Sequence, residues 1–115
     1  MSYDVVLTRS FKHSVERLIK RFRHVKDDIH LAVETLLQNP RLGVPIPGGS
    51  GIRKLRVPNS DLTKGKSGGY RLLYYVHDQP TQTLYLLLLY AKSDQEDVTR
   101  QELQRLLDEL ADEIK

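Results

Sequence analysis

The 115-residue sequence predicts an α+β protein with the element order β-α-α-β-β-β-α. Two helical patterns follow each other directly in the first third of the chain, and three strand patterns with short connections come after them. A helical hairpin packed on a small, mainly antiparallel four-stranded sheet, with a further helix at the C-terminus, accommodates this order. The length suits one domain spanning residues 1–115.

The N-terminal part supplies one strand and the hairpin. Residues 3–8, YDVVLT, predict a strand, and Ser10 is placed to cap the helix that follows. Apolar residues recur at one-face spacing in both helices, at Phe11, Val15, Leu18, Ile19 and Phe22 and then at Val25, Ile29, Ala32, Val33, Leu36 and Leu37. Asn39 and Pro40 end the second helix, and the short connection between the two predicts a hairpin.

The other three strands are expected at residues 52–57, 70–78 and 83–92, which read IRKLRV, YRLLYYVHD and TLYLLLLYAK. Gly, Pro, Ser and Asn predict turns in the segments 41–51 and 58–69. Because the last of these strands is almost continuously apolar, we expect it to be central and covered on both faces.

The final helix is expected to begin near Thr99. Thr99 and Glu102 have the spacing of a capping box, in which each side chain accepts a hydrogen bond from the backbone N–H of the other. The apolar stripe that follows is Leu103, Leu106, Leu107, Leu110, Ala111 and Ile114.

The composition predicts a folded protein rather than a disordered or membrane-spanning one, with 39% hydrophobic and 29% charged residues. The longest apolar run falls well short of the roughly 20 residues that span a bilayer. The N-terminus has no signal-peptide pattern, so we expect a cytoplasmic protein. With no cysteine in the chain, disulfides and thiolate metal sites are excluded.

Positive charge is concentrated in one part of the chain. Residues 1–93 hold 15 Lys or Arg against 7 Asp or Glu, whereas residues 94–115 hold 3 against 8. A basic body is typical of nucleic-acid-binding proteins, although many other proteins are modestly basic as well.

Alternation along the strands predicts where part of this charge gathers. Residues two apart in a strand share a face, so Lys54 points the same way as Arg56, and Tyr90 the same way as Lys92. Arg53, Lys64 and Lys66 add positive charge in neighbouring parts of the sequence and are further candidates for binding nucleic acid.

Arg71 stands at the beginning of its strand, directly after Gly68, Gly69 and Tyr70. Glycines at such a place either let a bulky ligand approach the backbone closely or simply close a turn. The first alternative predicts that this end of the sheet faces a polyanion.

Other chemistries have less support in the sequence. The four histidines lack the close spacing of metal ligands. Asp94, Glu96 and Asp97 resemble a carboxylate cluster for a metal, but acidic residues are also favoured ahead of a helix N-terminus. We therefore expect neither a metal nor another cofactor.

Three stretches, KLR at 54–56, SGGYRLLYY at 67–75 and LLLLYAKSDQEDVT at 86–99, resemble the RelE/ParE toxin superfamily. The likeness is greatest to its HigB-like ribonuclease branch, and the helical hairpin ahead of the sheet resembles the family too. It implies a RelE-like fold and the toxin of a type II toxin-antitoxin system. It further implies a metal-independent endoribonuclease that cuts messenger RNA in the ribosomal A site and leaves a 2′,3′-cyclic phosphate.

The resemblance also implies roles for individual residues. Lys54 and Arg56 would contact RNA phosphates, with Lys54 as a possible proton acceptor, and Arg71 would hold the scissile phosphate. Tyr90 would stack on or position a base, and Lys92 would stabilise charge or transfer a proton. The sequence departs from RelE after Lys92, where an arginine and a later tyrosine are replaced, so the assignment of acid and base stays open.

The implied partners are a cognate antitoxin, messenger RNA and the ribosome with its rRNA. Two other functions remain open, because the fold is shared by toxins of different activity. One is a ParE-like protein that binds DNA gyrase without cutting RNA. The other is a catalytically decayed member that only binds its antitoxin.

Overall fold

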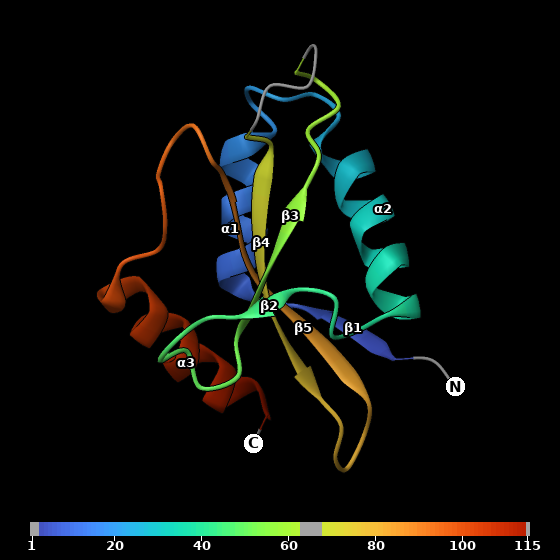
Figure 1. Cartoon of the computed structure of the whole chain (residues 1–115), viewed down its shortest axis with the longest axis vertical. Helices are drawn as coiled ribbons and strands as arrows, with labels where there is room; N and C mark the ends of the chain where they lie inside the picture. Colours follow the sequence, from blue (N-terminus) through green and yellow to red (C-terminus); the bar gives the residue numbers. More distant parts are fainter. Residues whose placement is uncertain (1–2, 63–67, 115) are drawn as a thin grey trace.

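The computed structural model describes residues 3–62 and 68–114, which form a five-stranded sheet with helices on both faces (Figure 1). The elements are β1 (Asp4–Leu7), α1 (Arg9–Leu18), α2 (Val25–Gln38), β2 (Val44–Pro45), β3 (Arg53–Val57), β4 (Tyr70–His77), β5 (Thr83–Ala91) and α3 (Arg100–Ile114). The α+β class, the helical hairpin and the C-terminal helix are confirmed.

The strands lie in the order β1-β5-β4-β3-β2. β3, β4 and β5 form the expected antiparallel meander, and β1 joins β5 as a parallel edge strand. The predicted four strands miss β2, whose two residues pair antiparallel with Arg53 and Lys54. Two residues are too few to show the alternation of apolar and polar side chains that predicts a strand, and β2 lies in a segment rich in glycine and proline. The sequence therefore indicates only a turn there.

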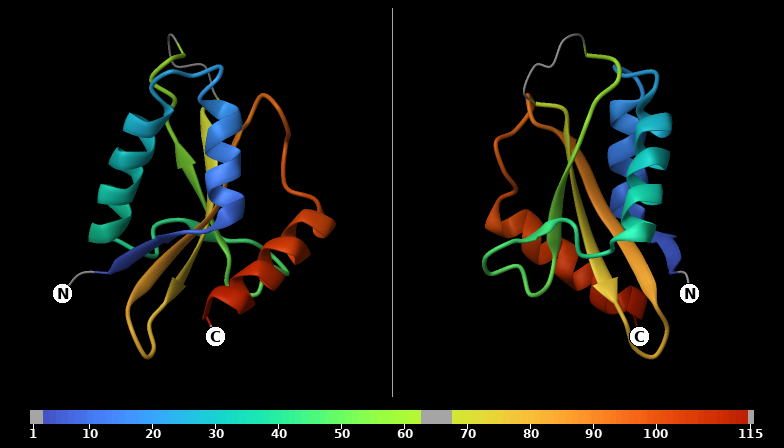
Figure 2. Two further views of the ribbon diagram at one scale, coloured as in Figure 1. Left: turned by 180° about the vertical axis from the view of Figure 1, so that it is seen from behind. Right: turned by 45° about the vertical axis from the view of Figure 1, so that its right-hand side comes forward.

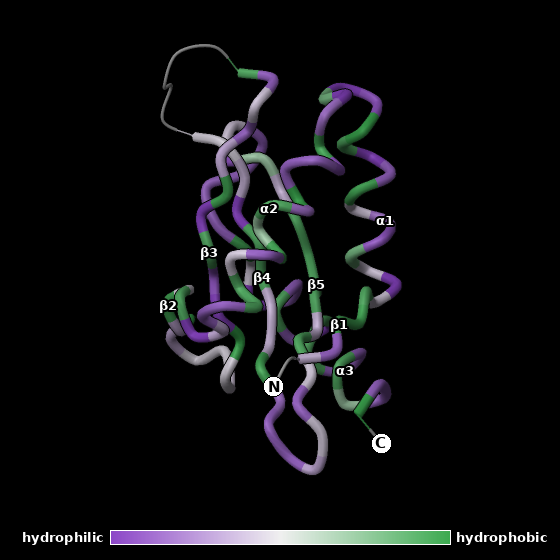
Figure 3. Tube along the Cα trace, turned by 90° about the vertical axis from the view of Figure 1, so that its right-hand side faces the viewer, coloured by the Kyte–Doolittle hydropathy of each residue, from purple (hydrophilic) through white to green (hydrophobic). Residues whose placement is uncertain are grey.

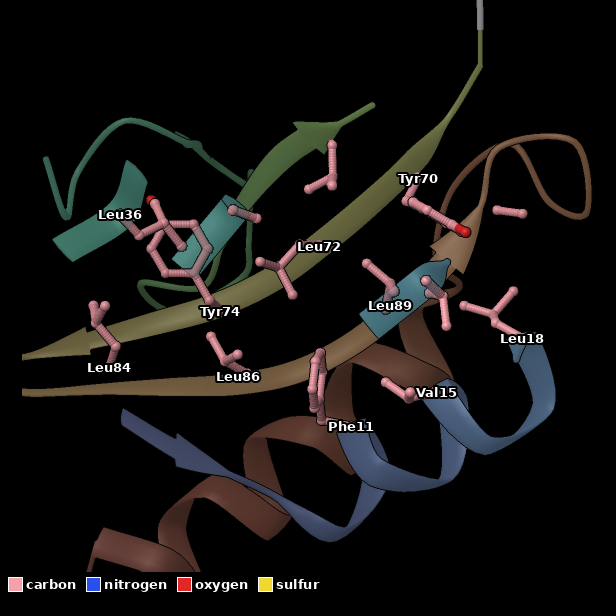
Figure 4. Packing of buried hydrophobic residues seen from close by; sticks show 14 residues of the cluster. Phe11, Val15, Leu18, Leu36, Tyr70, Leu72, Tyr74, Leu84, Leu86 and Leu89 are labelled. Atoms are coloured by element: carbon pink, nitrogen blue, oxygen red, sulfur yellow. The ribbon is translucent and has the colours of Figure 1, made fainter. Parts of the chain in front are cut away.

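The hairpin covers one face of the sheet, and α3 lies on the other (Figure 2). On the hairpin side, Phe11, Leu18 and Leu36 pack against Tyr70 and other inward residues of β4 and β5 (Figure 4). In Figure 3, β5 is drawn as a mostly hydrophobic stretch of the tube between β4 and α1. The predicted stripe of the first helix is corrected at Ile19, which directly follows the end of α1 at Leu18 and is 37% exposed.

Beyond the end of β1, side chains of α1 and of its N-cap form hydrogen bonds with the backbone edge of β5. The N-cap is Thr8 rather than the predicted Ser10: its Oγ1 accepts from the Phe11 backbone N–H and donates to the carbonyl of Leu86. One turn later, the buried Ser14 hydroxyl accepts from the backbone N–H of Leu89, at 3.1 Å. Both serine and threonine suit an N-cap, so the choice between them depends on this tertiary contact.

β5 carries one additional residue relative to β4. Leu73 is opposite Leu88, but the next residue, Tyr74, is opposite Leu86, so Leu87 is bulged. Leu87 and Leu88 both belong to the cluster on the α3 side of the sheet.

The capping box predicted for α3 is confirmed. The backbone N–H of Glu102 donates to Thr99 Oγ1, and that of Thr99 donates to Glu102 Oε1, both at 3.0 Å. Leu103, Leu106 and Leu110 then pack on β5. No helix in the described ranges has the length and apolar character needed to cross a membrane.

Candidate anion-binding site

Neighbouring strands bring two arginines side by side. Arg56 in β3 lies opposite Arg71 in β4, and Arg71 lies opposite Tyr90 in β5. Cross-strand partners point to the same face of a sheet. The three residues therefore form one row across the sheet on the face that carries α3.

The two lysines lie diagonally on either side of Arg71. Lys54 is opposite Leu73, two residues after Arg71 along β4. The backbone N–H of Lys92 donates to the carbonyl of Gly69, two residues before Arg71, at 2.9 Å. One lysine therefore lies in β3 and the other directly follows β5, and along β4 they are displaced from Arg71 in opposite directions.

An open pocket of about 620 Å³ lies over this arrangement. Its lining includes the four predicted cations Lys54, Arg56, Arg71 and Lys92, together with the carboxylate of Glu96. The structure therefore gathers four cations that are up to 38 positions apart in the sequence around one cavity.

Arg71 is 9% exposed, far more buried than an arginine at the beginning of a strand is expected to be. Its Nη1 donates to the carbonyl oxygens of Gly68 and Tyr70 at 2.7 and 3.2 Å. Within residues 3–62 and 68–114, no Asp or Glu forms an ion pair with Arg71 or Arg56. The segment 63–67 has no acidic residue in its sequence. A buried guanidinium without a carboxylate partner favours binding of an anion from outside.

The two lysines, in contrast, each have a carboxylate partner. Lys54 Nζ lies 3.3 Å from Asp97 Oδ1, and Lys92 Nζ lies 3.3 Å from Glu96 Oε2. Burial acts to raise the pKa of Asp97, but hydrogen bonds from the Val98 backbone N–H and from Lys54 leave it below its ordinary value. Both carboxylates come from the turn between β5 and α3.

Tyr90 lies beneath the site rather than in the pocket lining. Its side chain is 5% exposed, so the ring presents little surface to the pocket. The expected role of Tyr90 in stacking on or positioning a base stays a prediction. Its hydroxyl is buried and has no hydrogen-bond partner. Burial, reinforced by the carboxylates of Asp97 and Glu102 and opposed by Arg71, raises the pKa of Tyr90 to about 12.

Arg53, another of the RNA-binding candidates, is not part of this cluster. Arg53 Nη1 donates to the carbonyl oxygens of Arg41 and Gly43, at 3.1 and 2.6 Å, and so holds the segment that leads into β2. Alternation also puts Arg53 on the face opposite to Lys54. Lys64 and Lys66 lie outside the described residues.

Gly69 has a structural reason to be glycine. Its φ is +62°, and an added Cβ would lie 2.7 Å from the carbonyl oxygen of Val57. At Gly69, therefore, the close approach is made by the chain's own backbone at β3.

Sequence reasoning missed the part played by Glu96 and Asp97. Their position ahead of α3 indicated acidic residues at a helix N-terminus, but the side chains instead reach Lys92 and Lys54. The i, i+4 spacing of Lys92 and Glu96 was a visible signal. The pair of Asp97 with Lys54 spans 43 residues and has no signal in the sequence. Within the described ranges, no three His, Asp or Glu residues gather closely enough to hold a metal ion.

The fold resembles that of a known toxin. A mutant of the E. coli toxin RelE, solved in the free state, superposes with a TM-score of 0.58 and 17% sequence identity over 100% of both chains. This likeness concerns the fold, and it confirms the RelE-like architecture expected from the sequence.

A family model connects the chain to toxins by sequence as well. The model, described as ParE toxin of type II toxin-antitoxin system, parDE, matches residues 5–94. The match begins within β1 and ends at Asp94, so it includes all of the pocket lining except Glu96. A type II toxin has an antitoxin as its partner. The chain therefore belongs to the ParE toxin family of type II toxin-antitoxin systems, within the RelE/ParE superfamily.

Proposed function

We propose that this toxin is a metal-independent endoribonuclease that cuts messenger RNA on the ribosome, with the pocket over Arg71 as its active site. The observation that carries the proposal is the pair Arg56 and Arg71, which lie side by side without a carboxylate partner in a pocket flanked by two lysines. A phosphodiester supplies the negative charge that this pair lacks, and a guanidinium holds two phosphate oxygens at once.

RNA provides its own nucleophile, because a 2′-hydroxyl adjoins each phosphate. The protein has to orient that hydroxyl, move protons and stabilise the charge that develops on the phosphorus centre. Arg71 grips the scissile phosphate, Arg56 holds a neighbouring phosphate, and Lys92 stabilises the developing charge. One well-placed donor of this kind lowers a barrier by about 3 kcal/mol.

Tyr90 has a different role in this proposal from the one that the family resemblance implies. Tyr90 lies directly opposite Arg71 on the neighbouring strand and is 5% exposed, so it is placed to hold the arginine in position rather than to meet RNA. We therefore treat Tyr90 as a positioning residue, and the product remains a 2′,3′-cyclic phosphate.

Primer extension on cellular messenger RNA after brief induction of the toxin tests the proposal. We expect new 5′ ends inside translated regions within minutes. Intact transcripts in cells that have stopped growing would contradict it.

The family match supports a second candidate function, the gyrase binding of ParE-like toxins. Such a toxin stops growth through DNA topology and leaves messenger RNA whole. Relaxed plasmid DNA in induced cells, together with inhibition of purified gyrase, would favour this second function. Cut transcripts with normally supercoiled plasmids favour the ribonuclease.

A further inference from the structure

The outer edge of β3 is only partly covered by β2, which pairs with Arg53 and Lys54 alone. Alternate residues of an antiparallel strand exchange backbone hydrogen bonds with the same neighbour. The Ile46 N–H donates to the carbonyl of Ile52 at 2.9 Å, on the β2 side. Two and four residues later, Lys54 and Arg56 therefore turn their backbone groups to that side as well. Among the described residues, the N–H and C=O of Arg56 have no backbone partner there.

Exposed apolar side chains adjoin this open edge. Leu31 in α2, Leu42 and Val44 are 62, 45 and 61% exposed. Leu31 and Leu42 line a groove of about 390 Å³ between α2 and β3, whereas Leu42 and Val44 line the pocket over Arg71. Adjoining apolar side chains at a surface are typical of an interaction site. We refer to these three side chains, together with the backbone of Arg56, as the β3-edge surface.

The groove and the pocket lie on opposite faces of the sheet. Leu55 lines the groove and packs with the hairpin-side cluster. Arg56 and Arg71 lie on the other face and line the pocket. A strand added at this edge directs successive side chains to alternate faces. Apolar side chains match the face with the groove, and acidic side chains match the face with the arginines.

We propose that the β3-edge surface binds an extended segment of the antitoxin in which apolar and acidic residues alternate. The segment adds to β3 as a strand and forms hydrogen bonds with both backbone groups of Arg56. Its apolar side chains fill the groove beside Leu31. Its carboxylates meet Arg56 and Arg71, which have no carboxylate partner of their own among the described residues. The bound segment closes the pocket over Arg71, whether or not that pocket cuts RNA.

Charge favours this occupant over two others. A second copy of the chain, related by a two-fold axis, would bring the same cations opposite Arg56 and Arg71, where like charges repel. RNA supplies negative charge, but it has no strand backbone to pair with Arg56 and no aliphatic side chains for the groove beside Leu31. A type II toxin has an antitoxin as its partner, and a peptide segment of that antitoxin meets all three requirements.

The first test measures the affinity of the full-length toxin for its cognate antitoxin by calorimetry. Leu31→Glu places a carboxylate in the apolar groove and should weaken binding by about 10-fold or more. Leu7→Glu is the matched control, because Leu7 is 42% exposed and lies in β1, at the opposite edge of the sheet. It should bind as wild type does. Thermal unfolding shows that both variants are folded.

The second test follows hydrogen exchange of individual amides in free toxin and in the complex. The Arg56 N–H should exchange rapidly in free toxin and at least about 10-fold more slowly in the complex, because it gains an acceptor. The Val57 N–H faces β4 instead and should exchange slowly in both states. This neighbouring amide separates an added strand from a general loss of solvent access.

Three results would overturn the proposal. Unchanged affinity of Leu31→Glu excludes the groove, and an Arg56 amide that exchanges equally fast in the complex excludes an added strand. Loss of binding in Leu7→Glu alone assigns the antitoxin to the edge at β1. A toxin dimer that forms without antitoxin and is abolished by Leu31→Glu in sedimentation assigns the surface to a second copy.

Discussion

The two faces of the sheet are built from alternate residues of the same strands, yet they differ in what covers them. On the hairpin side, α1 and α2 seal the sheet with apolar side chains. On the other side, α3 covers β5, and the cations beside it remain open to a pocket. The comparison teaches that one face sets stability and that the uncovered part of the other face is free to serve function.

The sealed face should carry the largest effects on stability. Leu36 in α2 is fully buried, so Leu36→Ala should lower the free energy of unfolding by about 2 to 5 kcal/mol. Leu31 lies in the same helix but is 62% exposed, and Leu31→Ala should change it by less than about 0.5 kcal/mol. Urea denaturation of both variants checks this, and equal losses would contradict the difference between the two positions.

The open part of the other face should carry the largest effects on activity. Arg71→Ala should lower RNA cleavage by a factor of about 100 to 1,000, because a donor to the transition state is lost. Since Arg71 is buried and bonded to two carbonyl groups, we also expect a loss of about 1 kcal/mol in stability.

Two further variants sharpen this prediction. Arg71→Lys should restore only part of the rate, because an ammonium group lacks the paired donors of a guanidinium. Arg17→Ala removes the same charge from the exposed side of α1 and should cut RNA normally. A folded Arg71→Ala protein with normal cleavage would remove this residue from the site.

The capping box of α3 should have an intermediate effect. Thr99→Ala should cost about 1 kcal/mol of stability, because the Glu102 backbone N–H loses its acceptor. Thr35→Ala, within α2, is the control: its hydroxyl bonds back to the carbonyl of Leu31, an arrangement that does not favour a helix. Thermal unfolding should separate the two, and a stable Thr99→Ala protein would argue against the cap.

The smallest effect at neutral pH is expected at Tyr90. Its hydroxyl has no partner, so Tyr90→Phe should keep or slightly raise stability at pH 7. Because the pKa of Tyr90 is about 12 in the folded protein and about 10 when unfolded, the unfolded state loses its proton first as the pH rises. Stability that is fully present below pH 10 is then lost toward pH 12.

The variant Tyr90→Phe lacks this loss, so its advantage over wild type should grow between pH 10 and 12. Denaturation at pH 7 and pH 11 measures the difference. A constant difference at both pH values would show that the hydroxyl ionises as freely in the folded protein as in the unfolded chain.

Local patterns predicted most of the fold and only part of the candidate site. The helix stripes and the Thr99–Glu102 box depend on neighbours within four residues, and the structure confirms them except at Ile19 and Ala111, which are exposed. Alternation correctly put Lys54 and Arg56 on one face. The burial of Arg71 and the pair of Lys54 with Asp97 depend on contacts between distant segments, so they were not predictable from spacing.

β5 shows a further limit of pattern reading. A run of four leucines shows no alternation of apolar and polar residues, so the sequence does not reveal the bulge at Leu87. Counted from Leu84 without a bulge, Tyr90 and Lys92 would fall on the hairpin side of the sheet. The bulge returns Tyr90 to the face that carries Arg71.

The bulge gives insertions and deletions unequal consequences in this strand. A central strand normally tolerates neither, because one residue more or fewer turns every later side chain to the other face. Removing one leucine from residues 86–89 only straightens β5 and leaves Tyr90 and Lys92 on their present face. Adding one leucine demands a second bulge or reverses both side chains. Growth inhibition should therefore survive the shorter strand and be lost with the longer one, so that over evolutionary time this strand is freer to shrink than to grow.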